Sequence, residues 1–282
     1  MKARRPRPGL VVGGTAAVAA IGVALLPRIP QDPAYHLFAD ARTILGVPAG
    51  LNVLSNLTFA LVALVGLRLL RPGGATVRER GEQWAWRVFF VGVGLTSLGS
   101  AWYHLAPSNG TLVWDRLPMA VAFLGLLAAT LAERVDPELG GQLLGPMVLA
   151  GIGGVLFWAA TEHAGRGDLR PYVLVQFFPL IAIPLVLVLY RPRYSHGWLY
   201  LVALGLYALA KVAELADVEI FRVTGWLSGH TLKHLLAAAA VGTLAAMLAR
   251  RRSFTLRSDL LCNAPALSTQ PENKMSARRS EG

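Results

Sequence analysis

Four residues of this chain have the types and spacing needed to hold and assist a metal ion. His230 and His234 are four residues apart, so on a helix their imidazoles share one face and can grip a single ion. Ser100 and His104 repeat that spacing earlier in the chain. Three imidazoles, from His104, His230 and His234, would make a zinc site with an open fourth position, which is typical of catalytic zinc.

Water at the open position gives this site its expected chemistry. Zinc lowers the pKa of bound water towards about 7 and polarises a carbonyl oxygen. Asp115 follows His104 after a short turn and is predicted to orient or deprotonate the water, while Ser100 donates to the developing oxyanion. We expect Asp115 in or near the first turn of its helix, where the helix dipole favours a carboxylate.

The elements that must position these residues are apolar enough to lie in a membrane. The 282 residues are 54% hydrophobic and 15% charged, well below the charged fraction of about a quarter in soluble domains. Long apolar runs recur without the alternation of β-barrel strands, so we expect an all-α integral membrane protein, a seven-transmembrane helical bundle with one extra N-terminal transmembrane helix. The expected spans are Leu10–Leu26, Leu51–Leu70, Trp84–Leu105, Leu112–Leu131, Gln142–Ala160, Tyr172–Tyr190, Trp198–Leu215 and Gly229–Ala249.

Composition divides the chain into four parts. Residues 1–27 form a basic segment and the extra membrane helix or signal anchor, 28–49 an outward-facing linker, 50–250 the seven-helix domain, and 251–282 a polar tail expected to be disordered and cytoplasmic. We favour a retained first helix over a cleaved signal peptide, because Pro27-Arg28-Ile29-Pro30 is a poor cleavage site. The single cysteine, Cys262, allows no intramolecular disulfide.

Arginine placement predicts the orientation in the membrane. The net charge of +11 collects in the N-terminal segment, some loops and the tail, which indicates topology signals rather than nucleic-acid binding. We therefore expect cytoplasmic N- and C-termini and a zinc site towards the outer side. The arginines that then face the cytoplasm include Arg68, Arg71, Arg78, Arg80, Arg87, Arg191, Arg193, Arg250, Arg251 and Arg252.

These motifs also resemble a known family. Ser-x-x-x-His, then Asp-x-Leu-Pro-Met, then Gly-His-x-x-x-His is similar to the alkaline ceramidase family, above all to its bacterial phytoceramidase-like members. That family belongs to the membrane hydrolases that include the adiponectin and progestin receptors. The resemblance covers about Gly50 to Ala249 and is carried by Ser100, His104, Asp115, Leu117, Pro118, Met119, Gly229, His230 and His234, with Asn52, Ser55, Asn56, Leu57 and Asp217 also matching.

The resemblance implies a seven-helix bundle, zinc held by three histidines, and hydrolysis of the ceramide amide to a sphingoid base and a fatty acid by attack of zinc-bound water. The lipid substrate would enter from the bilayer. Two positions depart from the family pattern. The segment Asp32–Arg42 replaces an acidic calcium-binding segment, and Arg116 replaces an acid beside Asp115, which leaves calcium regulation and headgroup preference open.

Three alternatives stay open: a receptor-like sensor with a structural metal, a hydrolase of a non-sphingoid acyl lipid, and a haem protein. A structural metal site needs neither Ser100 nor Asp115, and a histidine pair on one helical face does not suit trans-axial haem ligation. We expect His36, Asp40 and His163 to be solvated loop residues. Lys211 and Glu214, near the outer end of their helix, are expected to form an internal ion pair. The oligomeric state is left undetermined.

Overall fold

The computed structural model describes residues 8–72, 77 and 79–254. Every element of regular secondary structure in these ranges is a helix. The β-type backbone pairing in these ranges consists of two isolated bridges. The basic residues before Pro8, together with Arg78, Cys262 and the tail beyond Phe254, lie outside the described residues. The all-helical fold class is thus confirmed for the part of the chain that the structure describes.

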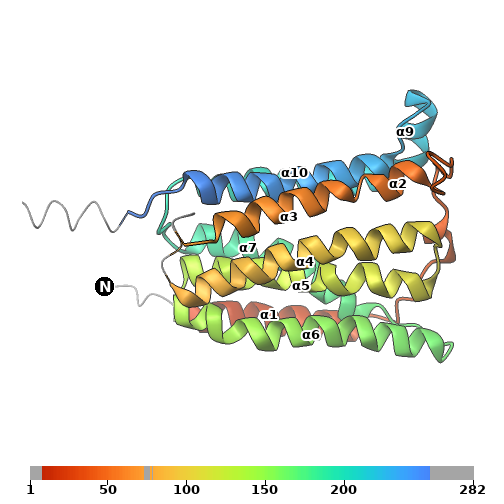
Figure 1. Ribbon diagram of the computed structural model, residues 1–282. Helices are drawn as coiled ribbons and strands as arrows, with labels where there is room; N and C mark the ends of the chain where they lie inside the picture. Colours follow the sequence, from red (N-terminus) through yellow and green to blue (C-terminus); the bar gives the residue numbers. More distant parts are fainter. Residues whose placement is uncertain (1–7, 73–76, 78, 255–282) are drawn as a thin grey trace, which may run out of the picture.

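Most of the long helices run side by side in one bundle, and α9 projects from one end of it (Figure 1). Residues 26–49 fold over this same end, whereas the last helix finishes at the opposite end (Figure 1). The elements are α1 (Pro8–Leu25), η1 (Pro33–His36), α2 (Gly50–Leu54), α3 (Leu57–Leu69), α4 (Arg80–Leu105), α5 (Asn109–Arg134), α6 (Pro137–His163), α7 (Arg170–Leu189), α8 (Leu199–Leu215), α9 (Asp217–Thr224) and α10 (Gly229–Arg250).

Six helical stretches of the described chain are long and apolar enough to cross a membrane: α2 with α3, then α4, α5, α6, α7 and α10. A seventh is reached if α8 and α9, which are bent by 80° at Ala216, count as one span. The apolar helix Leu10–Leu25 falls short of a full span. The bundle is compatible with an integral membrane protein, but the expected count of eight spans is not confirmed, because the described part of the first helix and α8 alone are each shorter than a full span.

The expected span Leu51–Leu70 is interrupted at Ser55 and Asn56, between α2 and α3. Ser55 Oγ donates to the Asn52 carbonyl at 3.0 Å, and Asn56 Nδ2 donates to the same carbonyl at 2.8 Å. Such local side-chain bonds compete with the helical ladder. The interruption matters for function because it turns the Ser55 hydroxyl towards α10.

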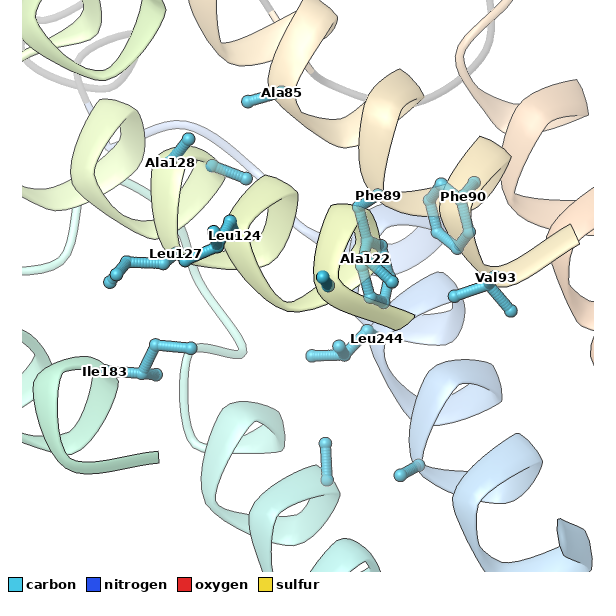
Figure 2. Close-up of a cluster of buried hydrophobic side chains, with 14 of the residues drawn as sticks. Ala85, Phe89, Phe90, Val93, Ala122, Leu124, Leu127, Ala128, Ile183 and Leu244 are labelled. Atoms are coloured by element: carbon cyan, nitrogen blue, oxygen red, sulfur yellow. The ribbon is translucent and has the colours of Figure 1, made fainter. Parts of the chain in front are cut away.

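Helices α4 and α5 pack closely because small residues let their backbones approach. A Cβ on Gly92 would lie 2.7 Å from the Ala122 nitrogen, and one on Gly99 would lie 2.7 Å from the Trp114 carbonyl carbon. Figure 2 shows Phe89 of α4 beside Ala122 of α5, with Leu244 of α10 close to both. This core fixes the end of α4 against the start of α5, where the predicted site residues lie.

The segment between α1 and α2 covers one end of the bundle. Asp40 is 1% exposed and is held by Arg42, whose hydrogen bonds lower the pKa of the Asp40 carboxyl and keep it charged. His36 contacts Tyr103 Oη and Asn109 Oδ1, each at 2.9 Å. The prediction of solvated loop residues is therefore wrong for Asp40 and His36, because this segment packs on the bundle. His163 is exposed, as predicted.

A buried ionic cluster closes the opposite end of the bundle. Arg251 donates to Glu82 Oε1 at 2.5 Å and to Glu133 Oε2 at 2.9 Å, and all three side chains are at most 1% exposed. Tyr194 donates to Glu82 at 2.9 Å, and Tyr200 to Glu133 at 3.1 Å. The cluster joins α4, α5, α8, the loop before α8 and the end of α10.

Candidate metal centre

Two helix ends bring the three predicted histidine ligands together. His104 lies in the last turn of α4, and His230 and His234 lie in the first turns of α10. Ser228 begins α10 by accepting a hydrogen bond from the Thr231 amide, and Asp217 accepts from the His230 amide at 2.7 Å. These caps fix both α10 histidines against α4.

The histidines form one compact, buried group. A ligand nitrogen from each ring lies within 4.8 Å of the other two, and His104, His230 and His234 are 1%, 4% and 2% exposed. Both ring nitrogens of His104, and Nε2 of His230, are buried without a hydrogen-bond partner among the described residues. Buried nitrogens are rarely left unpaired, so this cluster could hold a metal ion.

Ser55 orients the third ligand. Its Oγ lies 2.8 Å from His234 Nδ1, and because the hydroxyl proton is directed at the Asn52 carbonyl, the oxygen accepts from the imidazole. Nδ1 of His234 therefore carries the proton, which leaves the Nε2 lone pair for a metal. Supporting hydrogen bonds of this kind are usual around metal-bound histidine.

Ser100 and Asp115 are brought close to the histidines. Both line one internal cavity together with His234, and the Ser100 hydroxyl lies beside the Asp115 carboxyl group. Asp115 is 7% exposed and lies in the second turn of α5, not the first. The expected helix start was wrong because Ser108 and Thr111 form a capping box that begins α5 at Asn109.

No protein-family model matches the chain, and no curated protein matches it. The chemistry of the site therefore carries the functional proposal.

The cavity extends from this site into the bundle and has a volume of about 260 Å³. Its walls are mainly apolar and come from α3, α4, α5, α7, α8 and α10. Along α10 it runs from Lys233 to Leu244, which at 1.5 Å per helical residue is about 16 Å. A slender apolar chain fits such a space, with its polar end at Asp115.

Aromatic residues of the covering segment close the outer side of the site. The Phe38 ring centroid lies 4.6 Å from those of both His104 and His230. Burial raises the pKa of the neighbouring Tyr35 hydroxyl, which stays protonated and donates to Glu214 at 3.3 Å. These contacts cover the histidines at this end of the bundle.

The structure brings the five predicted residues into one region and surrounds them with several that sequence reasoning did not place at the site. The predicted pair Lys211–Glu214 is present, but Glu214 also binds Lys233 at 2.6 Å, and both lysines line the cavity. Lys233 lies between the two α10 histidines in the sequence, and a lysine in an apolar helix was a usable signal. Phe38 gave no such signal, because its approach depends on the path of the covering segment.

Proposed function

We propose that this protein is a zinc-dependent transmembrane amidohydrolase that cleaves the amide bond of ceramide-like lipids. The observation that carries the proposal is the convergence of three buried histidines on one point, beside Ser100 and Asp115, at the polar end of an apolar cavity. The likeness of these motifs to the alkaline ceramidase family supports the same reaction.

Zinc is the ion that best suits the ligand set, because three neutral imidazoles with one open position are typical of catalytic zinc. When bound, zinc would lower the pKa of water and polarise the amide carbonyl. His104, His230 and His234 would hold it, and Ser55 would keep His234 in the tautomer that binds metal.

Asp115 and Ser100 have distinct roles in the proposed hydrolysis. Asp115 takes a proton from water as the water oxygen bonds to the amide carbon, and returns a proton to nitrogen as the carbon–nitrogen bond breaks. Ser100 lies beside that carboxylate, so its single hydroxyl proton orients Asp115 before the reaction. Once Asp115 has taken the proton from water, the hydroxyl can turn and donate to the charge that develops on the carbonyl oxygen. The products are an amine and a fatty acid.

The acyl chain would occupy the apolar cavity. Helix α8 packs on α10. Across the cavity it meets α7, where Gln176 Nε2 of α7 donates to Tyr207 Oη of α8 at 3.2 Å. We propose that lipids enter from the bilayer between α7 and α8. Phe38 and the rest of the covering segment close the alternative aqueous route.

The proposal includes the topology. We infer a seven-span hydrolase domain in which α8 and α9 form one bent span, preceded by α1 as an extra N-terminal membrane helix. The arginine pattern supports cytoplasmic termini, a zinc site towards the outer side, and a bacterial inner-membrane location.

A lipid panel tests the function. Purified protein is incubated with ceramides, N-acyl amino acids and glycerolipids, in zinc-loaded and metal-stripped form, and the released fatty acid is identified by mass spectrometry. We expect release from amides that is lost on chelation and restored by zinc. A zinc-loaded protein that releases fatty acid from no amide contradicts the proposal, and a Soret band in the purified protein contradicts zinc as the sole cofactor.

A further inference from the structure

Arg116 is a buried cation on the wall of the cavity, next to Asp115. It is 5% exposed, and its Nη2 donates to Gln31 Oε1 at 2.6 Å. Its Nη1 is buried and has no hydrogen-bond partner among the described residues. Arg116 thus lines the cavity with a guanidinium that has one donor nitrogen without a partner.

Aromatic rings fix the direction of this guanidinium. Its central carbon lies 4.3 Å from the ring centroid of Trp158 and 4.7 Å from that of Tyr172. Cation–π contacts hold the group in place but leave its N–H edge free to donate. The side chain is thus held in one orientation before any ligand arrives.

The other charged side chains of the cavity already have partners within the protein. Glu214 binds Lys211 and Lys233, and Asp115 has the Ser100 hydroxyl within reach. No carboxylate of the described chain lies within ion-pairing distance of Arg116. The wall carries three basic side chains, Lys211, Lys233 and Arg116, and two acidic ones, Asp115 and Glu214, so the basic groups exceed the acidic groups by one.

We propose that Arg116 Nη1 binds a carboxylate in the substrate headgroup, so that the preferred substrates are N-acyl amino acids. This inference rests on the proposed function. A buried guanidinium without a counter-ion is costly, and an anionic ligand would remove that cost. One excess basic group and one free nitrogen suit a monoanion better than a phosphate dianion.

The position of Arg116 also limits where the anion lies in the lipid. Asp115 and Arg116 both line the cavity, so the residue that handles the amide proton and the residue that binds the anion meet the same ligand. An N-acyl amino acid has its carboxylate one carbon away from the amide nitrogen, which matches this arrangement. Water adds to the acyl carbon, the carbon–nitrogen bond breaks, and the nitrogen takes a proton, giving a fatty acid and a free amino acid.

Binding to metal-stripped protein tests the inference without hydrolysis. The probes are N-dodecanoylglycine, its neutral analogue N-dodecanoylglycinamide, and a cationic N-dodecanoyl diamine, with calorimetry in detergent as the readout. A charge-assisted hydrogen bond predicts that the wild type binds the carboxylate about 10- to 100-fold more tightly than the neutral amide. The cationic lipid should bind most weakly.

Variants test whether Arg116 is the source of the preference for the carboxylate. Arg116→Gln should abolish the preference for the carboxylate, and Arg116→Lys should keep part of it. Arg222→Gln is the matched control, since it removes one exposed positive charge from α9, outside the cavity, and should leave the preference unchanged.

Equal wild-type affinity for the carboxylate and the neutral amide would overturn the inference, and so would a preference that survives in a folded Arg116→Gln protein. If that variant does not fold, the wild-type series decides. Failure of the proposed function and failure of the carboxylate site give different results. A charge preference without any hydrolysis refutes only the proposed function, whereas zinc-dependent hydrolysis of ceramide without a charge preference refutes only the carboxylate site.

Discussion

Ser55 Oγ lies 2.8 Å from His234 Nδ1, although the two residues are 179 positions apart in the chain. The contact exists because the helix is interrupted after Leu54 and the serine turns towards the start of α10. It commits one histidine to the tautomer that offers Nε2 to a metal.

Ser55→Ala should weaken zinc binding while the fold is kept. Loss of a supporting hydrogen bond to a metal-bound histidine typically lowers metal affinity by about 10- to 100-fold. The affinity is measured by competition with a chromophoric chelator. Thr58→Ala, which removes a hydroxyl that bonds only the Ser55 carbonyl in the described structure, is the control and should bind zinc like the wild type. Equal affinities for the two variants would show that Ser55 does not support the site.

His230→Ala should empty the metal site. We expect about one zinc per wild-type chain and close to none in the variant, because two imidazoles alone hold the ion weakly. Elemental mass spectrometry of the purified protein measures this. His163→Ala removes an exposed histidine at the end of α6 and should keep full metal content. Full zinc content in His230→Ala would remove that residue from the ligand set.

Asp115→Asn should keep zinc and lower turnover by roughly 100-fold or more, since it removes the proton acceptor and changes the shape little. Ser100→Ala should cost at most about 3 kcal/mol of transition-state stabilisation. Because Ser100 acts partly through Asp115, the double variant should be little worse than Asp115→Asn. Turnover is measured beside metal content. Loss of zinc in Asp115→Asn would make the aspartate a ligand, and full activity would refute the mechanism.

Arg251→Met should destabilise the bundle by about 3–5 kcal/mol, because it leaves Glu82 and Glu133 buried without this cation. Thermal unfolding in detergent measures the loss. Arg250→Ala, which changes the neighbouring exposed arginine, is the control and should change the thermal stability little. Adding Glu82→Gln to Arg251→Met should restore part of the stability. A stable Arg251→Met protein would show that the cluster contributes little.

A reporter fused after Ser253 should lie in the cytoplasm, on the side opposite the zinc site. This follows from the arginine asymmetry between the two sets of loops. In a bacterial host, a fluorescent-protein fusion should be bright and an alkaline phosphatase fusion inactive. Phosphatase activity at this position would invert the proposed orientation.

The residues that the sequence predicted correctly are those whose relationship is local. Helical periodicity alone puts Ser100 near His104 and His230 near His234, and apolar length alone identifies most of the spans. The meeting of α4 with α10 was also predictable, because both helix ends were assigned to one side of the membrane. The start of α5 was misplaced because its capping box uses Thr111 where the usual signature has Glu or Gln.

The contacts that could not be predicted join segments far apart in the chain. Ser55 reaches His234, Gln31 reaches Arg116, and Phe38 reaches two histidines through packing that no periodicity encodes. His36 and Asp40 of the covering segment were expected to be solvated because connecting segments usually run over the surface. Its burial follows from bonds made elsewhere, such as the Ala39 amide to Asp217 at 2.8 Å.

The ionic cluster at the far end of the bundle has a consequence for biosynthesis. Glu82 enters the membrane with α4, but the arginine that it meets is synthesised 169 residues later, at the end of α10. A chain is made from its N-terminus, so this carboxyl waits for most of translation before its counter-charge emerges. This end of the bundle can therefore close only after the last helix is complete, and a chain that stops before Arg251 lacks the cation that joins Glu82 to Glu133.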